Sequence, residues 1–360
     1  MNGRTECFGR MLHDVTLDYD YVGIFKNGLA RVIESGKGED KKPRKLSERK
    51  SGFIDKTGDL VIAAEYHTAS DFSEGFAAVK KEGRGGYIDK TGKVVIPLIF
   101  NKALSFCEGL AAVKKEDKWG FINKSGETVV PFEYDFTHSF HDGYASAVKD
   151  GKWGVIDKSG AITVPFELEY DYVGNFHDDR ARARTGKAPF TSKGEEYYRW
   201  LATGNDFPMA TEKYGFIDKK GKLVIDPDYD SAHDFHEGVA LVNKNGKQLF
   251  IDTAGNELFG NDYDEMLDMF EGLAAVEKDG MWGFTDKENN AVIPVRYGFD
   301  NGAYFFSEGL AAVIMDDKFG YIDRTGRLVI AVEYDRVNCV YEGLAAVEKN
   351  GKWGIIEFTA

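Results

Sequence analysis

Three histidines with similar neighbours are the residues of this chain best suited to bind a metal ion. His141 and His177 lie in Phe-His-Asp segments, and His236 lies in Phe-His-Glu. Neutral imidazole beside carboxylate suits Zn²⁺ or Ni²⁺, and imidazole also titrates near neutral pH. The corresponding position of related segments holds Lys26 or Ser73. The alternatives are therefore a metal-binding or pH-sensing site and a half-exposed position that tolerates many polar residues.

Carboxylates recur before turn glycines, as in Asp-Lys-Thr-Gly. An aspartate there bonds to its own backbone two residues on, and glycine takes the left-handed conformation. We interpret these aspartates as turn caps rather than acid–base groups, and the glutamates before glycine in the same way. The aspartates are Asp55, Asp89, Asp157, Asp218, Asp252, Asp286 and Asp323, and the glutamates are Glu74, Glu108, Glu271, Glu308 and Glu342. The sequence has no phosphate-cradling loop, nucleophile elbow or zincin helix, so we expect no catalytic residue, no enzyme activity and no cofactor.

A repeat that runs through the whole chain sets the positions of these residues. One copy reads EGLAAVKKEDKWGFINKSGETVVPFEYD at 108–135, and EGLAAVEKNGKWGII follows at 342–356. Successive copies mostly lie 34 residues apart, as Gly120 and Gly154 do, which gives nine units. The best-preserved aromatic-glycine steps are Trp119-Gly120, Trp153-Gly154, Trp282-Gly283 and Trp353-Gly354.

Each unit contains three short apolar runs separated by turn residues. The runs are rich in β-branched and aromatic residues and too short for helices, which predicts a three-stranded antiparallel meander. The segment that links two units is a candidate for a fourth short strand or a turn. One meander cannot bury both faces, so we expect the tryptophans to pack between units and the adjacent glycines to let a neighbouring backbone approach.

The chain begins with the end of a unit and finishes in the middle of one. Together the two ends make one complete unit, which favours a β-propeller-like ring over an open β-solenoid or superhelical β-array. Residues 1–360 are therefore predicted to form a single all-β domain, with insertions at about 36–50 and 185–213.

The composition excludes several classes of partner. The formal net charge is −14, which argues against nucleic acid and against an anionic membrane surface. No apolar run approaches the roughly 18 residues of a membrane span. The N-terminal residues lack an apolar signal core, so we expect a cytoplasmic protein. The three cysteines are too far apart to indicate a disulfide framework or a zinc motif.

The pattern W-G-x-I-D-K-x-G-x-x-V-I-P, preceded by E-G-L-A-A-V, resembles the bacterial WG (or KWG) repeat. The resemblance covers nearly the whole chain. The departures are Ser51, Gly85 and Gln248 at the aromatic position, and Arg180 and Leu249 at glycine positions. This resemblance implies a β-repeat of largely unknown function that mediates interactions, and it supplies no catalytic residue.

The two insertions are the strongest candidates for contacts with a partner. The first is locally basic and includes Lys41, Lys42 and Arg44; its alternative interpretation is a solvated loop. The second carries residue types that are enriched in binding hot spots, although these aromatic side chains could instead cover the fifth unit. They are Tyr197, Tyr198, Arg199, Trp200 and Phe207.

The sequence therefore predicts a non-catalytic scaffold for protein–protein interaction. The second insertion and the rim of units four to six would carry the contacts. A metal-binding, possibly enzymatic, site on the histidine rim is the alternative function. Self-association, in which the basic insertion of one copy meets an acidic face of another, is also open.

Overall fold

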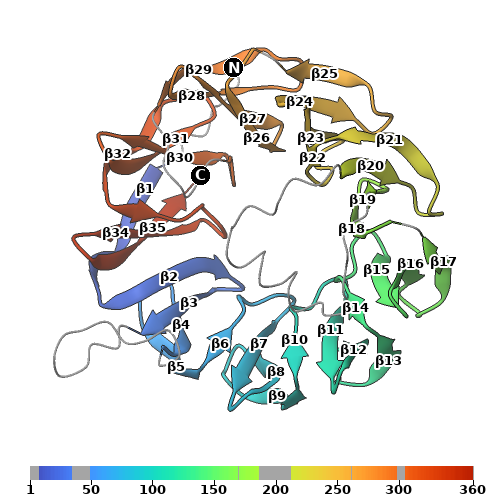
Figure 1. Cartoon of the computed structure of the whole chain (residues 1–360). Helices are drawn as coiled ribbons and strands as arrows, with labels where there is room; N and C mark the ends of the chain where they lie inside the picture. Colours follow the sequence, from blue (N-terminus) through green and yellow to red (C-terminus); the bar gives the residue numbers. More distant parts are fainter. Residues whose placement is uncertain are drawn as a thin grey trace, which may run out of the picture. The chain divides into compact units, whose positions relative to one another are not determined.

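The computed structural model describes residues 8–34, 49–168, 170–185, 212–260, 262–297 and 305–359. Within these ranges every regular element is a β-strand, and the strands form nine small antiparallel sheets (Figure 1). The contacts divide the chain into two compact units: unit 1 is Met1–Ile99 with Asp262–Ala360, and unit 2 is Phe100–Asn261. The prediction of a single domain stays a prediction.

Unit 2 contains four sheets, each of four strands in chain order. They are β10 (Lys102–Ala103), β11 (Leu110–Lys115), β12 (Lys118–Asn123) and β13 (Thr128–Tyr134); β14 (Phe136–Thr137), β15 (Tyr144–Lys149), β16 (Lys152–Asp157) and β17 (Ile162–Leu168); β18 (Tyr172–His177), β19 (Arg180–Thr185), β20 (Lys213–Ile217) and β21 (Leu223–Tyr229); and β22 (Ser231–Ala232), β23 (Val239–Lys244), β24 (Lys247–Asp252) and β25 (Glu257–Gly260).

Unit 1 contains five sheets. Four of them are β2 (Tyr19–Lys26), β3 (Leu29–Glu34), β4 (Ser51–Asp55) and β5 (Leu60–Tyr66); β6 (Thr68–Ala69), β7 (Phe76–Lys81), β8 (Arg84–Asp89) and β9 (Val94–Phe100); β26 (Glu265–Phe270), β27 (Leu273–Lys278), β28 (Met281–Thr285) and β29 (Ala291–Tyr297); and β30 (Leu310–Met315), β31 (Lys318–Asp323) and β32 (Leu328–Tyr334). Of the two alternatives for the linking segment, it forms a fourth strand in every sheet except β30–β32, where residues 298–304 of the linking segment lie outside the described residues.

The fifth sheet of unit 1 joins the two ends of the chain. Its order is β1 (Phe8–Leu17), β35 (Lys352–Thr359), β34 (Leu344–Lys349) and β33 (Arg336–Val337). In the antiparallel register Met11 pairs with Ile356 and Leu17 with Trp353. An N-terminal strand that completes the last sheet is how a β-propeller closes, so the fold class is the predicted β-propeller and not the open array.

The repeated tryptophans lie between successive sheets, as predicted. Trp119 of β12 is 2% exposed and belongs to a cluster with Phe140 and Ile156 of the next sheet. Trp353 of β35 packs in the same way against Val22 and Phe25 of the sheet β2–β5. Because successive sheets within a unit bury their faces against one another, the core of each unit is a series of similar inter-sheet layers.

The glycine after each aromatic residue leaves space for the close approach of another strand. That strand belongs to the same sheet and not to the neighbouring unit. A Cβ on Gly120 would lie 2.6 Å from the carbonyl oxygen of Val130, where the pairing of β12 with β13 changes register. A bulged strand crosses closely here, and only glycine leaves space. At position 249 the glycine is replaced by leucine, and the glycine lies on the last strand instead, because Leu249 pairs with Gly260 of β25.

One predicted glycine position requires a correction. We expected Arg180 to replace the glycine that follows the acidic residue. The two residues at the tip of the β18–β19 hairpin are instead Asp178 and Asp179, with φ of 50° and 62°. Asp179 therefore stands where the other turns have glycine, because aspartate tolerates the left-handed conformation better than most residues.

Candidate functional site

The three histidines occupy the same backbone position in three successive sheets of unit 2. Each is the first residue of a two-residue hairpin. His141 exchanges both backbone hydrogen bonds with Tyr144, at 2.9 and 3.0 Å, and His236 does so with Val239, at 2.8 and 3.0 Å. The tip residues Asp142 and Gly143 have φ of 51° and 82°, as in a type I′ turn. The tight turn therefore fixes the backbone from which each imidazole projects.

An acidic residue at the hairpin tip of one sheet bonds to the hairpin of the following sheet at several places. Oε2 of Glu108 accepts a hydrogen bond from the backbone N–H of Gly143 at 3.0 Å. Oδ2 of Asp178 accepts one from the N–H of Gly238 at 2.8 Å. The prediction that the glutamates before glycine cap their own turns is therefore wrong for Glu108, which caps its neighbour's turn. We call this contact the carboxylate clasp.

The same clasp recurs in unit 1. The two carboxylate oxygens of Glu308 accept hydrogen bonds from the N–H groups of Glu342 and Gly343, both at 2.7 Å. Glu342 likewise accepts from Asn27 and Gly28, at 2.6 and 2.7 Å. Backbone N–H groups at a left-handed tip point outward, and a carboxylate is a strong acceptor for them. The clasp therefore ties neighbouring sheets together at their hairpin tips.

The structure brings the three imidazoles into a row. The ring centroids of His141 and His177 are 4.7 Å apart, and those of His177 and His236 are 5.3 Å apart. All three residues are half-buried. Burial and the neighbouring His177 lower the pKa of His141, while the carboxylates of Glu108, Asp234 and Asp142 act in the opposite direction. The structure therefore brings His141 next to His177 and His177 next to His236, as their equivalent positions predicted, whereas a common centre for all three is not formed.

His138 lies beside this row but belongs to an aromatic layer. Its ring stacks on Trp153, with centroids 5.8 Å apart and planes at 16°, and meets Tyr172 edge-on. Burial lowers the pKa of His138 to about 4, and its Nε2 is buried without a hydrogen-bond partner. His138 is therefore neutral near pH 7 and works as a packing residue.

The row is not a ready-made metal cage. Among the described residues no group of three or more His, Cys, Asp or Glu side chains surrounds a point where an ion could sit. The arrangement offers neighbouring pairs of imidazoles instead of three that converge on one centre.

The aspartates of the Asp-x-x-Gly turns cap these turns as predicted. Oδ1 of Asp89 accepts from the N–H and Oγ1 of Thr91, at 2.9 and 2.6 Å, and from the N–H of Lys93 at 3.1 Å. The hydroxyl bond from Thr91 is the main reason why the pKa of Asp89 is lowered. The same pattern lowers the pKa of Asp157. These carboxylates are therefore committed to turn structure.

The residues predicted to contact a partner through the two insertions lie outside the described residues. They are Lys41, Lys42 and Arg44 of the first insertion, and Tyr197, Tyr198, Arg199, Trp200 and Phe207 of the second. Their role stays a prediction.

Sequence reasoning missed a set of exposed apolar side chains. Of the thirteen large hydrophobic residues exposed in the described ranges, ten lie on the strand that ends a sheet, which we call the last strand. They are Leu60, Val61, Val94, Ile99, Ile162, Val224, Leu258, Val292, Val295 and Leu328. The V-V-I-P type of run marks these strands in the sequence. Such a run predicts a strand, but it does not show that some of its apolar side chains are exposed.

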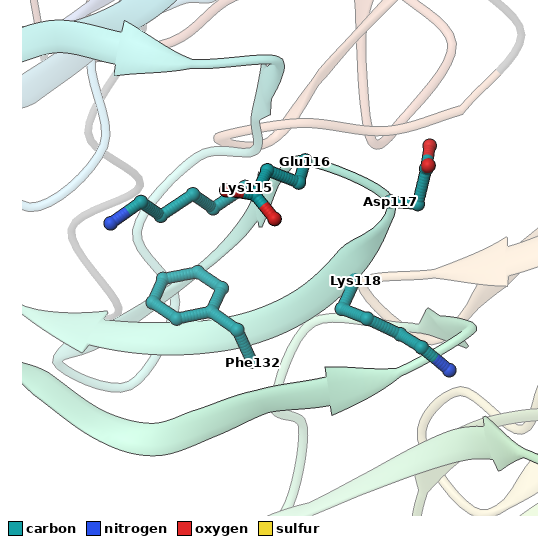
Figure 2. A pocket seen from close by; sticks show the side chains of 5 residues that line it. All are labelled: Lys115, Glu116, Asp117, Lys118 and Phe132. Atoms are coloured by element: carbon teal, nitrogen blue, oxygen red, sulfur yellow. The ribbon is translucent and has the colours of Figure 1, made fainter.

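A shallow pocket lies at the β11–β12 hairpin of unit 2. Figure 2 shows Phe132 of β13 on one side, with Asp117 and Lys118 pointing away from its ring. The other lining residues are Lys115 and Glu116. Lys118 is already paired with Asp135 at 2.6 Å, so the pocket presents mixed charges around one phenyl ring and no convergent set of donors.

The described part of the chain contains no helix that is long and apolar enough to span a membrane.

A match to a solved structure with a TM-score above 0.5 supports the fold. A crystal structure described as that of the eukaryotic initiation factor matches with a TM-score of 0.53 and 9% identity, covering 82% of this chain and 86% of its own. The WD40 domain of Neurospora crassa Pan2 matches with a TM-score of 0.36 and 13% identity, covering 99% and 96%. Apo AztD from Citrobacter koseri matches with a TM-score of 0.39 and 12% identity, covering 98% of each chain. No curated protein matches the chain in sequence.

The family follows from the repeat itself. The model of the WG containing repeat matches nine times, at residues 15–37, 52–84, 86–119, 119–153, 153–187, 214–247, 250–282, 282–319 and 319–353. These matches cover most of the chain and include three of the four tryptophan-glycine steps, together with Trp353 of the fourth. The chain therefore belongs to the family of proteins built from WG-containing repeats.

Proposed function

We propose that this protein is a non-catalytic scaffold that binds other proteins. The observation that carries the proposal is the concentration of exposed apolar side chains on the last strands. Single exposed apolar residues are ordinary on protein surfaces, whereas a repeated set confined to one kind of strand is typical of a contact surface. A β-propeller of repeats is compatible with this role because it holds many equivalent strands in fixed positions.

Proline restricts how a partner can use the last strands. Five of them contain it, at Pro97, Pro131, Pro165, Pro227 and Pro294. Proline lacks a backbone donor, so it discourages a foreign strand from pairing with the edge. Contacts at these strands would be made by side chains. The inserted segments at 36–50 and 185–213 would add basic and aromatic contacts to the same partner.

The last strands β5 and β32 are the sharpest place to test the proposal, because they have equivalent sequences without proline. They read LVIAAEY and LVIAVEY. Leu60 is 46% exposed and Leu328 is 47% exposed at the same position of the two strands. Replacing Leu60 and Leu328 by lysine would put a charge where an apolar side chain contacts the partner, and charged residues are depleted from the buried centre of protein interfaces.

The experiment compares two full-length double variants by quantitative co-purification from the native cell. Leu60→Lys with Leu328→Lys removes the apolar side chains. Ala63→Lys with Ala331→Lys is the matched control, because both alanines are exposed on the same strands and the added charge is identical. We expect the leucine variant to lose bound partners about tenfold or more, which corresponds to about 1.4 kcal/mol of binding free energy, and the alanine variant to keep them. Equal capture by both variants and the wild type would refute the contact surface.

The second insertion is tested separately with Trp200→Ala combined with Tyr198→Ala. Loss of capture with an unchanged melting temperature would support the aromatic contact. Met281→Ala, which removes an exposed apolar side chain of β28 that is not on a last strand, is the control.

A further inference from the structure

We propose that His141, His177 and His236 form a binding row for a borderline divalent transition-metal ion such as Cu²⁺, Ni²⁺ or Zn²⁺. Each bound ion would be held by two neighbouring imidazoles, with water in its other positions. The inference is independent of the protein-binding function proposed above.

The spacing of the rings fits this mode of binding. An imidazole nitrogen binds Zn²⁺ at about 2.0–2.1 Å and lies about 1.1 Å from its ring centroid, so two imidazoles on one ion have centroids roughly 4.5–5.5 Å apart. The observed separations of 4.7 Å for His141 with His177 and 5.3 Å for His177 with His236 fall in this range. His177 therefore takes part in both pairs.

The clasps hold the row in place before any ion arrives. Oδ2 of Asp142 accepts from the N–H of Asp179 at 3.2 Å, which connects the hairpin of His141 to that of His177. Asp178 connects the hairpin of His177 to that of His236 through Gly238, at 2.8 Å. Because three tight turns and two clasps fix the backbones, only the side-chain torsions need ordering when an ion binds.

The charges around the row are mixed. The carboxylates of Glu108, Asp142 and Asp234 lie close enough to His141 to act on its charge. Basic side chains are also near: Lys158 is 3.8 Å from Glu108, Lys219 pairs with Asp179, and Arg182 pairs with Asp234 at 2.6 Å. The position that precedes His141 in the row, one sheet earlier, holds Cys107. Imidazole and thiolate are ligands that borderline and soft transition metals prefer over Mg²⁺ or Ca²⁺.

Two protein ligands define the expected affinity and selectivity. No third side chain completes a cage among the described residues, so the ion should exchange readily and bind more weakly than a structural zinc. Nitrogen ligands without an imposed geometry follow the Irving–Williams order, so we expect Cu²⁺ to bind more tightly than Ni²⁺ or Zn²⁺.

The test is equilibrium dialysis of the full-length protein against CuCl₂, NiCl₂ or ZnCl₂, with metal analysis and the visible absorption band of bound Cu²⁺ as a second readout. His177→Ala removes the ring common to both pairs and should lower affinity about tenfold or more. His141→Ala and His236→Ala each leave one pair and should change affinity only about two- to threefold. His67→Ala removes an exposed imidazole of unit 1 and should have no effect.

A gain-of-function variant tests the geometry without relying on a loss. Ser307 and Tyr341 occupy the same row position in two neighbouring sheets of unit 1, and the clasp of Glu308 joins their hairpins. Ser307→His with Tyr341→His should create a second site whose affinity lies within about tenfold of the native one.

Several outcomes would overturn the proposal. They are the absence of bound metal in the wild type at sub-millimolar concentrations, binding by His177→Ala equal to that of the wild type, and a loss in His67→Ala as large as in His177→Ala. Equal large losses in all three single variants of the row would show that three imidazoles share one ion, which contradicts the pairwise arrangement.

Discussion

The hairpin tips of unit 1 and unit 2 share a backbone and a clasp but differ in the residue that stands before the tip. In unit 2 this position holds three successive histidines, whereas in unit 1 it holds Ser307 and Tyr341 among others. The tip residues Asp178 and Glu308 nevertheless have nearly equal φ, at 50° and 52°. The carboxylate is thus part of the scaffold, while the residue before it is free to vary and to acquire a function.

The largest expected effect tests whether the scaffold is the same in both units. Gly283→Ala in unit 1 places a Cβ 2.5 Å from the carbonyl oxygen of Ile293, and Gly120→Ala in unit 2 places one 2.6 Å from that of Val130. Since backbone cannot move aside cheaply, we expect each variant to lower the free energy of unfolding by about 3 kcal/mol, measured by urea unfolding.

Tip glycines provide the control for this prediction. A Cβ on Gly272 or Gly109 meets no atom within 4 Å, although φ is +74° and +83°. Gly272→Ala and Gly109→Ala should therefore lose only about 1 kcal/mol, from the left-handed conformation alone. A loss at Gly120 no greater than at Gly109 would contradict the close approach of the last strand.

An intermediate effect should distinguish the clasps of the two units. The carboxylate of Glu308 accepts two backbone hydrogen bonds, from Glu342 and Gly343, whereas that of Asp178 accepts one from Gly238. We expect Glu308→Ala to destabilise the fold by about 1–2 kcal/mol and Asp178→Ala by about 1 kcal/mol, because hydrogen bonds to a charged acceptor contribute more than neutral ones. Urea unfolding measures both.

The conservative variant Glu308→Gln checks that the clasp is a hydrogen bond. The amide oxygen still accepts, so roughly half of the loss should be restored. If Glu308→Gln is as unstable as Glu308→Ala, charge rather than hydrogen bonding explains the contact.

The smallest expected effect compares two equivalent turns, one in each unit. Asp89 of unit 1 has a pKa lowered from 3.8, chiefly by the hydrogen bond from Thr91. The unfolded state then binds more protons than the folded state below about pH 4. The contribution of Asp89 to stability is complete above the unfolded pKa and is lost as the pH falls through the lower folded pKa.

Unit 2 supplies the natural control, because Asn123 occupies this turn position and accepts the same bonds from Ser125 at 3.0 and 2.8 Å. Asp89→Asn should keep the turn and make the acid side of the stability–pH curve shallower, whereas Asn123→Asp should make it steeper. Urea unfolding at several pH values between about 2 and 5 measures the slopes, and unchanged slopes in both variants would refute the assignment.

Much of this architecture is predictable from sequence because the same pattern of residues occurs in nine repeats. The strand runs, the Asp89 type of turn cap and the inter-sheet place of Trp119 all follow from local chemistry and from the need to bury a face. The meeting of His141 with His177 follows from equal positions in equal units. These predictions depend on relations within one unit or between two neighbours of the same kind.

The predictions that were wrong or missing concern features that the residues of one unit do not determine by themselves. The sequence around a carboxylate that precedes a turn glycine is the same whether the carboxylate caps its own turn or the turn of the following sheet, as Glu108 does. The tip position was assigned to Arg180 instead of Asp179 because this hairpin has no glycine to mark it, and the strand pairing and backbone torsions identify it. The exposure of Leu60 could not be seen either, since an apolar run shows that a strand exists but not whether anything covers its edge.

The sheet that unites β1 with β35 has a consequence for how the molecule is made on the ribosome. Arg10 and Glu357, which form an ion pair across this sheet, are separated by 347 positions in sequence. Arg10 must therefore wait for 347 further residues to be synthesised before it meets Glu357, and pairings at such sequence distance form slowly. During that interval β1 lacks the strand it pairs with, and an unpaired strand edge is open to pairing with another nascent copy.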